Sequence, residues 1–224
     1  MNKTDSKKNK TKEILVFNPF KVGSSTLEYI LNRMENTKAT KFHAYDLKQQ
    51  TRVPPENVHS VILVYRNPIE LYMSAFFEDC TQSAYPYYYG TQEQVRSATA
   101  EQLVNHFNKF DWTQYQWLNY GYYIEQLNKI FDVDKNDVWS FINSNEKYKV
   151  LNGRHNAKNV VCLLLKTKHL YESVDVINSA LDVELKKMEC HRAAKNRWYF
   201  SKYKEFKELM AKKLNDNSKV TTAR

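Results

Sequence analysis

Residues 14–34 read ILVFNPFKVGSSTLEYILNRM, and this stretch decides the fold. The apolar run Ile14–Phe17 is typical of a buried strand, and Ser25–Met34 has the spacing of a helix. Between them lies Gly23, one of only four glycines in 224 residues, beside a lysine and three hydroxyl residues. Free N–H groups at the start of a helix attract anions, so a loop of this kind predicts a phosphate-binding site.

Other runs extend this alternation along the chain. Val61–Tyr65 and Val160–Leu165 are continuous apolar runs, as expected for parallel strands buried on both faces, and Thr40–Tyr45 (TKFHAY) predicts a weaker strand. Helical patterns occupy Ser25–Met34, Pro68–Asp79, Glu101–Phe110, Gln114–Ile130, Tyr171–Leu181 and Phe200–Leu214. Strands that alternate with helices predict an α/β fold with a central, mostly parallel sheet flanked by helices.

The positive charge of the chain, +9 in total, lies at its two ends. Residues 1–13 hold five lysines against two acidic residues, and residues 195–224 hold nine lysines and arginines against three acidic residues. Residues 14–194 are therefore neutral, whereas a nucleic-acid-binding module would carry basic residues throughout its fold. We predict a disordered basic tail at 1–13 and a single domain over 14–224.

Cysteine usage and hydropathy predict a cellular location. The chain has no run of eighteen apolar residues and no apolar segment near its start, so neither a transmembrane helix nor a signal peptide is expected. Three scattered cysteines, Cys80, Cys162 and Cys190, argue against a disulfide framework. We expect a cytoplasmic protein, in the host cytoplasm if the source is a virus.

The glycine loop matches neither of the common nucleotide-binding motifs. Lys21 stands two residues before Gly23, so the order of the Walker motif, G-x-x-x-x-G-K-[ST], is absent, and G-x-G-x-x-G is absent too. The loop can still bind an anion, because Gly23 admits a close backbone approach, Lys21 supplies charge and Ser24, Ser25 and Thr26 supply hydroxyl donors. The alternative is a capped helix beside a surface lysine.

A second signal follows the strand at Val61–Tyr65. There the chain reads RNPIELYMSAFF, with Arg66 and Ser74 eight residues apart. This pattern resembles the 3′-phosphate site of sulfotransferases, which use 3′-phosphoadenosine 5′-phosphosulfate (PAPS) as donor, and PFKVGSST resembles the loop after that family's first strand. The resemblance implies that Arg66 and Ser74 hold the 3′-phosphate. It assigns the 5′-phosphosulfate to Lys21, Val22, Gly23, Ser24, Ser25 and Thr26.

The resemblance continues toward the end of the chain. Phe131–Leu170 is similar to the hairpin region of the sulfotransferases. KNRWYFSKY resembles the Asn-Lys-Trp-Tyr signature of the capsular-polysaccharide synthesis family, with Arg197 for lysine and Phe200 for serine. The implied fold is the P-loop-like sulfotransferase fold. A basic loop in that family often closes over the 3′-phosphate, which implies this role for Arg197 and its neighbours His191, Arg192, Lys195 and Asn196.

The implied activity is transfer of a sulfuryl group from PAPS to a hydroxyl, in a carbohydrate or polysaccharide. Lys21 would neutralise the leaving phosphate. Family members carry a general base on the strand after the first helix, where this chain has His43, with Glu28 as the second candidate. No metal is expected, because C-x-x-C and H-E-x-x-H are absent. The alternatives are a P-loop-like nucleotide kinase and a nucleic-acid-binding module.

The segment Tyr85–Gly90 (YPYYYG) is rich in aromatic residues. Aromatic faces stack on sugar rings, so these residues are candidates for contacts with the acceptor. The other interpretation is packing in the core or in an ordered loop, which the sequence favours.

Overall fold

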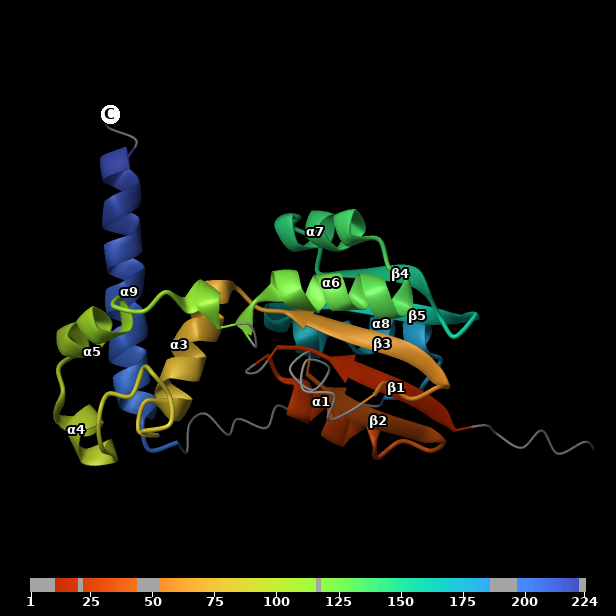
Figure 1. Cartoon of the computed structure of the whole chain (residues 1–224), viewed down its shortest axis with the longest axis horizontal. Helices are drawn as coiled ribbons and strands as arrows, with labels where there is room; N and C mark the ends of the chain where they lie inside the picture. Colours follow the sequence, from red (N-terminus) through yellow and green to blue (C-terminus); the bar gives the residue numbers. More distant parts are fainter. Residues whose placement is uncertain (1–10, 20–21, 44–52, 116–117, 186–196, 222–224) are drawn as a thin grey trace, which may run out of the picture. The chain divides into compact units, whose positions relative to one another are not determined.

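The computed structural model describes residues 11–19, 22–43, 53–115, 118–185 and 197–221 (Figure 1). The chain forms two compact units, each built from two segments. The first, here called the sheet unit, combines Met1–Arg66 with Gln116–Cys190, and the second, the helical unit, combines Asn67–Tyr115 with His191–Arg224. A single domain over 14–224 stays a prediction.

The sheet unit contains a five-stranded sheet in the order β2-β1-β3-β5-β4. Its strands are β1 (Lys12–Phe17), β2 (Thr37–Phe42), β3 (Val58–Tyr65), β4 (Tyr148–His155) and β5 (Lys158–Lys166). All neighbouring pairs are parallel except β4 and β5, which are antiparallel. The predicted α/β class with a mostly parallel sheet is therefore confirmed, and the three apolar runs lie within β1, β3 and β5.

Helices flank this sheet (Figure 1). They are α1 (Ser24–Leu31), α6 (Tyr120–Phe131), α7 (Lys135–Asn143) and α8 (Val174–Leu181), the last preceded by the 3₁₀ helix η3 (Thr167–Ser173). Helix α6 packs on the strands through aromatic rings: the centroids of Tyr123 and Phe17 lie 5.3 Å apart, and those of Phe131 and His155 lie 5.1 Å apart. Glycine is required in β4, because a Cβ on Gly153 would lie 2.4 Å from the carbonyl oxygen of Phe131.

Strands β4 and β5 form a hairpin in the region where the sequence resembles one. The turn residues Asn156 and Ala157 have φ angles of 49° and 62°, as in the tight turns that join twisted antiparallel strands. The hairpin places β4 at one edge of the sheet, where its partner among the described strands is β5.

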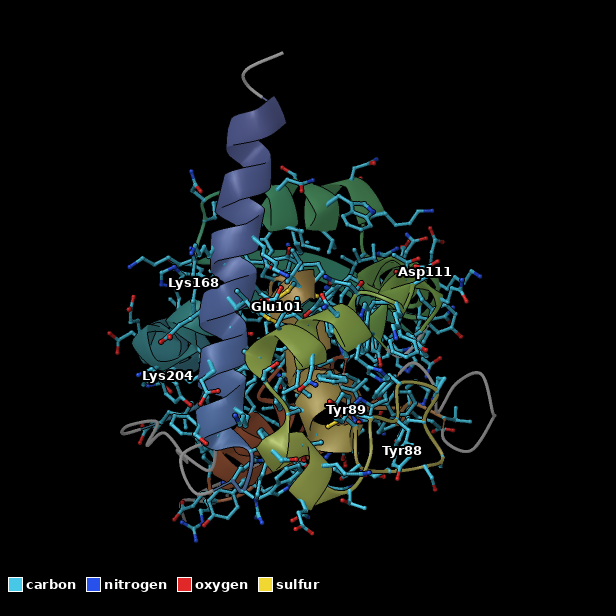
Figure 2. All side chains as sticks on the ribbon, turned by 90° about the vertical axis from the view of Figure 1, so that its left-hand side faces the viewer. Tyr88, Tyr89, Glu101, Asp111, Lys168 and Lys204 are labelled. Atoms are coloured by element: carbon cyan, nitrogen blue, oxygen red, sulfur yellow. The ribbon has the colours of Figure 1, made fainter. Side chains whose placement is uncertain are left out.

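The helical unit has an aromatic core. Its helices are α3 (Pro68–Asp79), α4 (Gln92–Ser97), α5 (Ala100–Phe107), η1 (Trp112–Gln114) and α9 (Phe200–Thr221). The ring of Phe206 in α9 lies 6.0 Å from Phe76 and 5.4 Å from Phe107, and Trp112 stacks on Phe107 at 4.7 Å. Glu101 of α5 lies beside α9 (Figure 2), where its carboxylate pairs with Lys213 Nζ at 2.8 Å.

The aromatic segment Tyr85–Gly90 contributes to this core. Tyr87 is fully buried, and its ring centroid lies 4.9 Å from that of Trp112. Tyr88, labelled beside Tyr89 in Figure 2, is 40% exposed. Core packing is thus confirmed for Tyr87, which is unavailable to a sugar.

Several predicted element boundaries differ from the structure by three residues or more. The helix predicted over Gln114–Ile130 begins at Tyr120, because the side chain of Asn119 caps it there by accepting the N–H of Gly121 at 2.8 Å. Helix α9 continues beyond Leu214 to Thr221. Strand β2 spans Thr37–Phe42 rather than Thr40–Tyr45, and residues 44 and 45 lie outside the described residues.

In the part of the chain that the structure describes, every helix is too short or too polar to cross a membrane.

Candidate functional site

The strand order places a topological switch point at the carboxyl ends of β1 and β3. Strand β2 lies on one side of β1 and β3 on the other, so the connection after β1 leads to β2 on one side and the connection after β3 leads toward β4 and β5 on the opposite side. Open α/β sheets bind ligands at such a switch point, just beyond the strand ends. Asn18 follows β1, Arg66 follows β3, and α1 begins a few residues after Asn18. These elements define the candidate site.

The first turn of α1 is built to accept an anion. Gly23 has a φ angle of 91°, in the left-handed region that glycine adopts most readily, and its carbonyl oxygen accepts the N–H groups of Thr26 and Leu27 at 3.1 and 3.2 Å. The N–H groups of Ser24 and Ser25 make no hydrogen bond to another described residue. The first turn holds no acidic residue, so the positive end of the helix dipole is not neutralised there.

The predicted loop residues differ in which of their groups could contact a bound anion. Val22 is fully buried and Ser24 is 5% exposed, so Val22 can contribute only its backbone. The Ser25 side chain is exposed and that of Thr26 is partly exposed. Lys21 lies outside the described residues. Binding of a phosphosulfate by these residues stays a prediction.

Lys41 brings a cation to the first turn of α1. Its Nζ donates to the Oγ of Ser25 at 3.1 Å, and its backbone N–H donates to Glu28 Oε1 at 2.9 Å. A cation beside the N-terminus of a helix opposes the helix dipole, and an anion between them would relieve that repulsion. The sequence analysis missed Lys41, although it stands two residues before His43, the spacing that brings strand side chains to the same face.

His43 directly follows β2, which pairs with β1 as the prediction for this residue required. The imidazole is buried, with 8% of the residue exposed, and its Nδ1 lies 2.7 Å from the backbone oxygen of Asn18. The alternative base Glu28 lies on α1, where its carboxylate accepts the N–H of Lys41. This contact gives Glu28 a structural role and leaves His43 as the better candidate.

Asn18 links β1, β2 and β3 at the switch point, and the sequence analysis missed it. It is fully buried, its N–H donates to the Phe42 oxygen at 3.2 Å, and its Oδ1 accepts the N–H of Val64 at 2.5 Å. Its Nδ2 has no hydrogen-bond partner among the described residues. The signal was an asparagine directly after a buried strand, where side-chain amides often bond to neighbouring backbone groups.

Arg66 is anchored through its backbone. Its N–H donates to the hydroxyl of Tyr120 at 2.8 Å, and that hydroxyl donates to the carbonyl oxygen of Val64 at 3.2 Å. Burial raises the pKa of Tyr120, so its phenol stays protonated and keeps donating. Thr167 Oγ1 donates to the Tyr65 oxygen at 3.0 Å on the same strand. These bonds hold the end of β3 in place, and the Arg66 side chain extends from that end.

The other predicted phosphate ligands belong to the helical unit. Ser74 lies half-buried in α3, whose first turn is capped by Asn67 through a 2.9 Å bond from the Ile69 N–H. Arg66 belongs to the sheet unit, so a joint 3′-phosphate site with Ser74 stays a prediction. The Arg197 guanidinium pairs with the Glu78 carboxylate, which also accepts the Tyr199 hydroxyl at 2.8 Å.

A phosphate at Arg197 would have to compete with that carboxylate, and its role also stays a prediction. His191, Arg192, Lys195 and Asn196 lie outside the described residues. Within the described ranges, no three His, Cys, Asp or Glu side chains gather as ligands for a metal ion.

Comparisons with known proteins add no assignment: no protein-family model, no curated protein and no solved structure matches this chain.

Proposed function

We propose that this protein transfers a sulfuryl group from PAPS to a hydroxyl of a carbohydrate or polysaccharide, within a P-loop-like sulfotransferase fold. The observation that supports the proposal best is the grouping at the switch point. There the uncapped start of α1, the Lys41 ammonium and the buried His43 imidazole come from neighbouring strand ends of one sheet. An anion site beside a histidine fits transfer of a charged group to a hydroxyl.

The proposed reaction uses these groups in distinct roles. The N–H groups of Ser24 and Ser25, with Lys41 and Lys21, bind the 5′-phosphosulfate and stabilise the charge that grows on the bridging oxygen. His43 takes the proton of the acceptor hydroxyl, whose oxygen bonds to sulfur. The bond between sulfur and the bridging oxygen breaks, and 3′-phosphoadenosine 5′-phosphate (PAP) leaves with that electron pair. The products are a sulfate ester, PAP and a protonated histidine.

Recognition of the 3′-phosphate separates PAPS from other adenine nucleotides. The proposal assigns this phosphate to Arg66 and Ser74, with Arg197 as a third ligand. An arginine fork matches phosphate geometry through two parallel hydrogen bonds. The firm backbone anchoring of Arg66 supports this assignment, because a fixed stem lowers the cost of ordering the guanidinium.

PAP should stabilise the protein far more than AMP does. At a concentration one hundred times its dissociation constant, a ligand that binds only the folded state adds about 3 kcal/mol. Arg66→Ala should bring the effect of PAP down to that of AMP, and Arg154→Ala, at an exposed position of β4, serves as the matched control. Thermal shift with PAP, AMP, ADP and ATP measures the difference. Equal shifts from PAP and AMP in the parent protein contradict the proposal, and a preference for ATP would favour a kinase.

Lys41→Met should lower the affinity for both PAP and AMP by about tenfold or more, since a charge-assisted hydrogen bond contributes roughly 1.5–3 kcal/mol. Methionine keeps an unbranched side chain of similar length and removes the charge together with the N–H donors, including the one that bonds Ser25. The control is Lys38→Met on the same strand, because Lys38 Nζ pairs with Glu13 at 2.9 Å away from the site. Titration calorimetry gives the affinities. Unchanged affinity for both nucleotides in Lys41→Met would remove Lys41 from the anion site.

A further inference from the structure

The contact between His43 and Asn18 determines which ring nitrogen of His43 carries the proton. A neutral imidazole has one N–H donor and one acceptor nitrogen. Nδ1 lies 2.7 Å from a backbone carbonyl oxygen, which can only accept, so Nδ1 is the donor. Nε2 then carries the lone pair whenever the ring is neutral. A general base needs that lone pair, and here it is assigned to one nitrogen.

Asn18, the residue that carries this carbonyl oxygen, is held in place on both sides of β1. Toward β2, the N–H of Asn18 donates to the Phe42 oxygen at 3.2 Å. Toward β3, its Oδ1 accepts the Val64 N–H at 2.5 Å, and the residue has no solvent exposure. Asn18 lies beyond the last regular strand pair, Phe17 with Phe42, and its two bonds continue the links between the strands there.

We propose that Asn18 is a positioning residue: its clamped backbone carbonyl fixes the Nδ1–H tautomer of His43 and directs Nε2 as the proton acceptor. The catalytic part of this inference rests on the proposed sulfotransferase function, whereas the tautomer does not. In the reaction, Nε2 bonds to the proton of the acceptor hydroxyl while Nδ1 keeps its own. The imidazolium that forms still donates from Nδ1 to Asn18, so the new charge is stabilised without any rearrangement.

The tautomer can be measured in the unmodified protein without any assay of activity. Long-range ¹H–¹⁵N correlation spectra separate protonated from unprotonated ring nitrogens, and the His43→Gln variant identifies the His43 signals among the six histidines of the chain. At a pH where the ring is neutral, we expect a protonated Nδ1 and an unprotonated Nε2. A protonated Nε2 in the neutral ring overturns the inference.

Two substitutions of similar size test whether the Asn18 side chain maintains this arrangement. Asn18→Leu removes the acceptor for the Val64 N–H, and Asn18→Asp keeps an oxygen there. The leucine variant should show a mixture of both His43 tautomers and a transfer rate lower by about tenfold or more, part of what a lost base costs. The aspartate variant should recover the Nδ1–H tautomer and most of the rate, and both should bind PAP.

The outcomes separate this inference from the proposed function. A parent-like tautomer and rate in a folded Asn18→Leu protein refute the role of the side chain. If the leucine variant does not fold, the spectrum of the unmodified protein and the recovery in Asn18→Asp still decide the question. A protein that has the Nδ1–H tautomer but neither binds PAP nor transfers sulfate refutes the sulfotransferase proposal and leaves the tautomer assignment intact.

Discussion

His43→Ala should lower sulfuryl transfer by about a hundredfold or more, the usual scale for a lost general base, while the affinity for PAP stays nearly unchanged. The separation follows from the proposed chemistry, because a residue that only accepts the acceptor's proton contributes little to holding the donor. Transfer of radiolabelled sulfate from PAPS to a panel of polysaccharides measures the rate, and titration calorimetry measures the PAP affinity.

Two comparisons sharpen this test. Lys21→Ala should lose transfer rate and donor affinity together, because its ammonium would contact the phosphosulfate both before and during transfer. His169→Ala, at a partly exposed histidine whose Nδ1 lies 3.3 Å from Glu172 Oε2, should behave like the parent protein. A folded His43→Ala protein that transfers sulfate at the parental rate would show that the base lies elsewhere, and Glu28 would be tested next.

Phe17→Ala should lower the free energy of unfolding by about 3–5 kcal/mol, the usual cost of emptying a buried phenylalanine site. Phe17 is fully buried, and its ring centroid lies 5.3 Å from Tyr123, 6.0 Å from Phe42 and 6.5 Å from Phe131. The ring thus joins β1, β2 and α6.

Denaturant unfolding followed by fluorescence gives the change in stability. Val53→Ala is the control, because Val53 is 81% exposed and should change the free energy of unfolding by less than about 0.5 kcal/mol. A Phe17→Ala protein as stable as the control would mean that the aromatic contacts around β1 do not support the sheet.

The strands that sequence alone predicted are those whose signal is local. Ile14–Phe17, Val61–Tyr65 and Val160–Leu165 are apolar without interruption because helices cover both faces of the sheet there. Strand β2 is less certain from sequence, since it lies at the sheet edge and only two of its residues, Ala39 and Phe42, are buried. Helix α7 was missed, although Asp134 caps it by accepting the Asn136 N–H at 2.7 Å.

The residues of the candidate site also differ in whether a local sequence pattern predicts them. The start of α1 was predictable, because a glycine followed by hydroxyl residues is a local pattern. Lys41 and Asn18 depend on strand pairing: the register that sets Val16 opposite Lys41 brings Lys41 to α1, and the clamp on Asn18 needs β2 and β3 on either side. No short-range pattern encodes those neighbours. The aromatic core of the helical unit likewise depends on contacts between residues far apart in sequence, which no local pattern predicts.

The order of the segments along the chain has a consequence for folding during synthesis. The chain leaves the sheet unit after Arg66 and returns at Gln116, so β5, the last of the described strands, is complete when residue 166 has been made. The core of the helical unit is completed later in synthesis, because Phe206 of α9 completes the packing around Phe76 and Phe107. On the ribosome, the sheet can close while the aromatic faces of α3 and α5 are still without α9. Such nascent chains present apolar surface to chaperones until translation reaches the final helix.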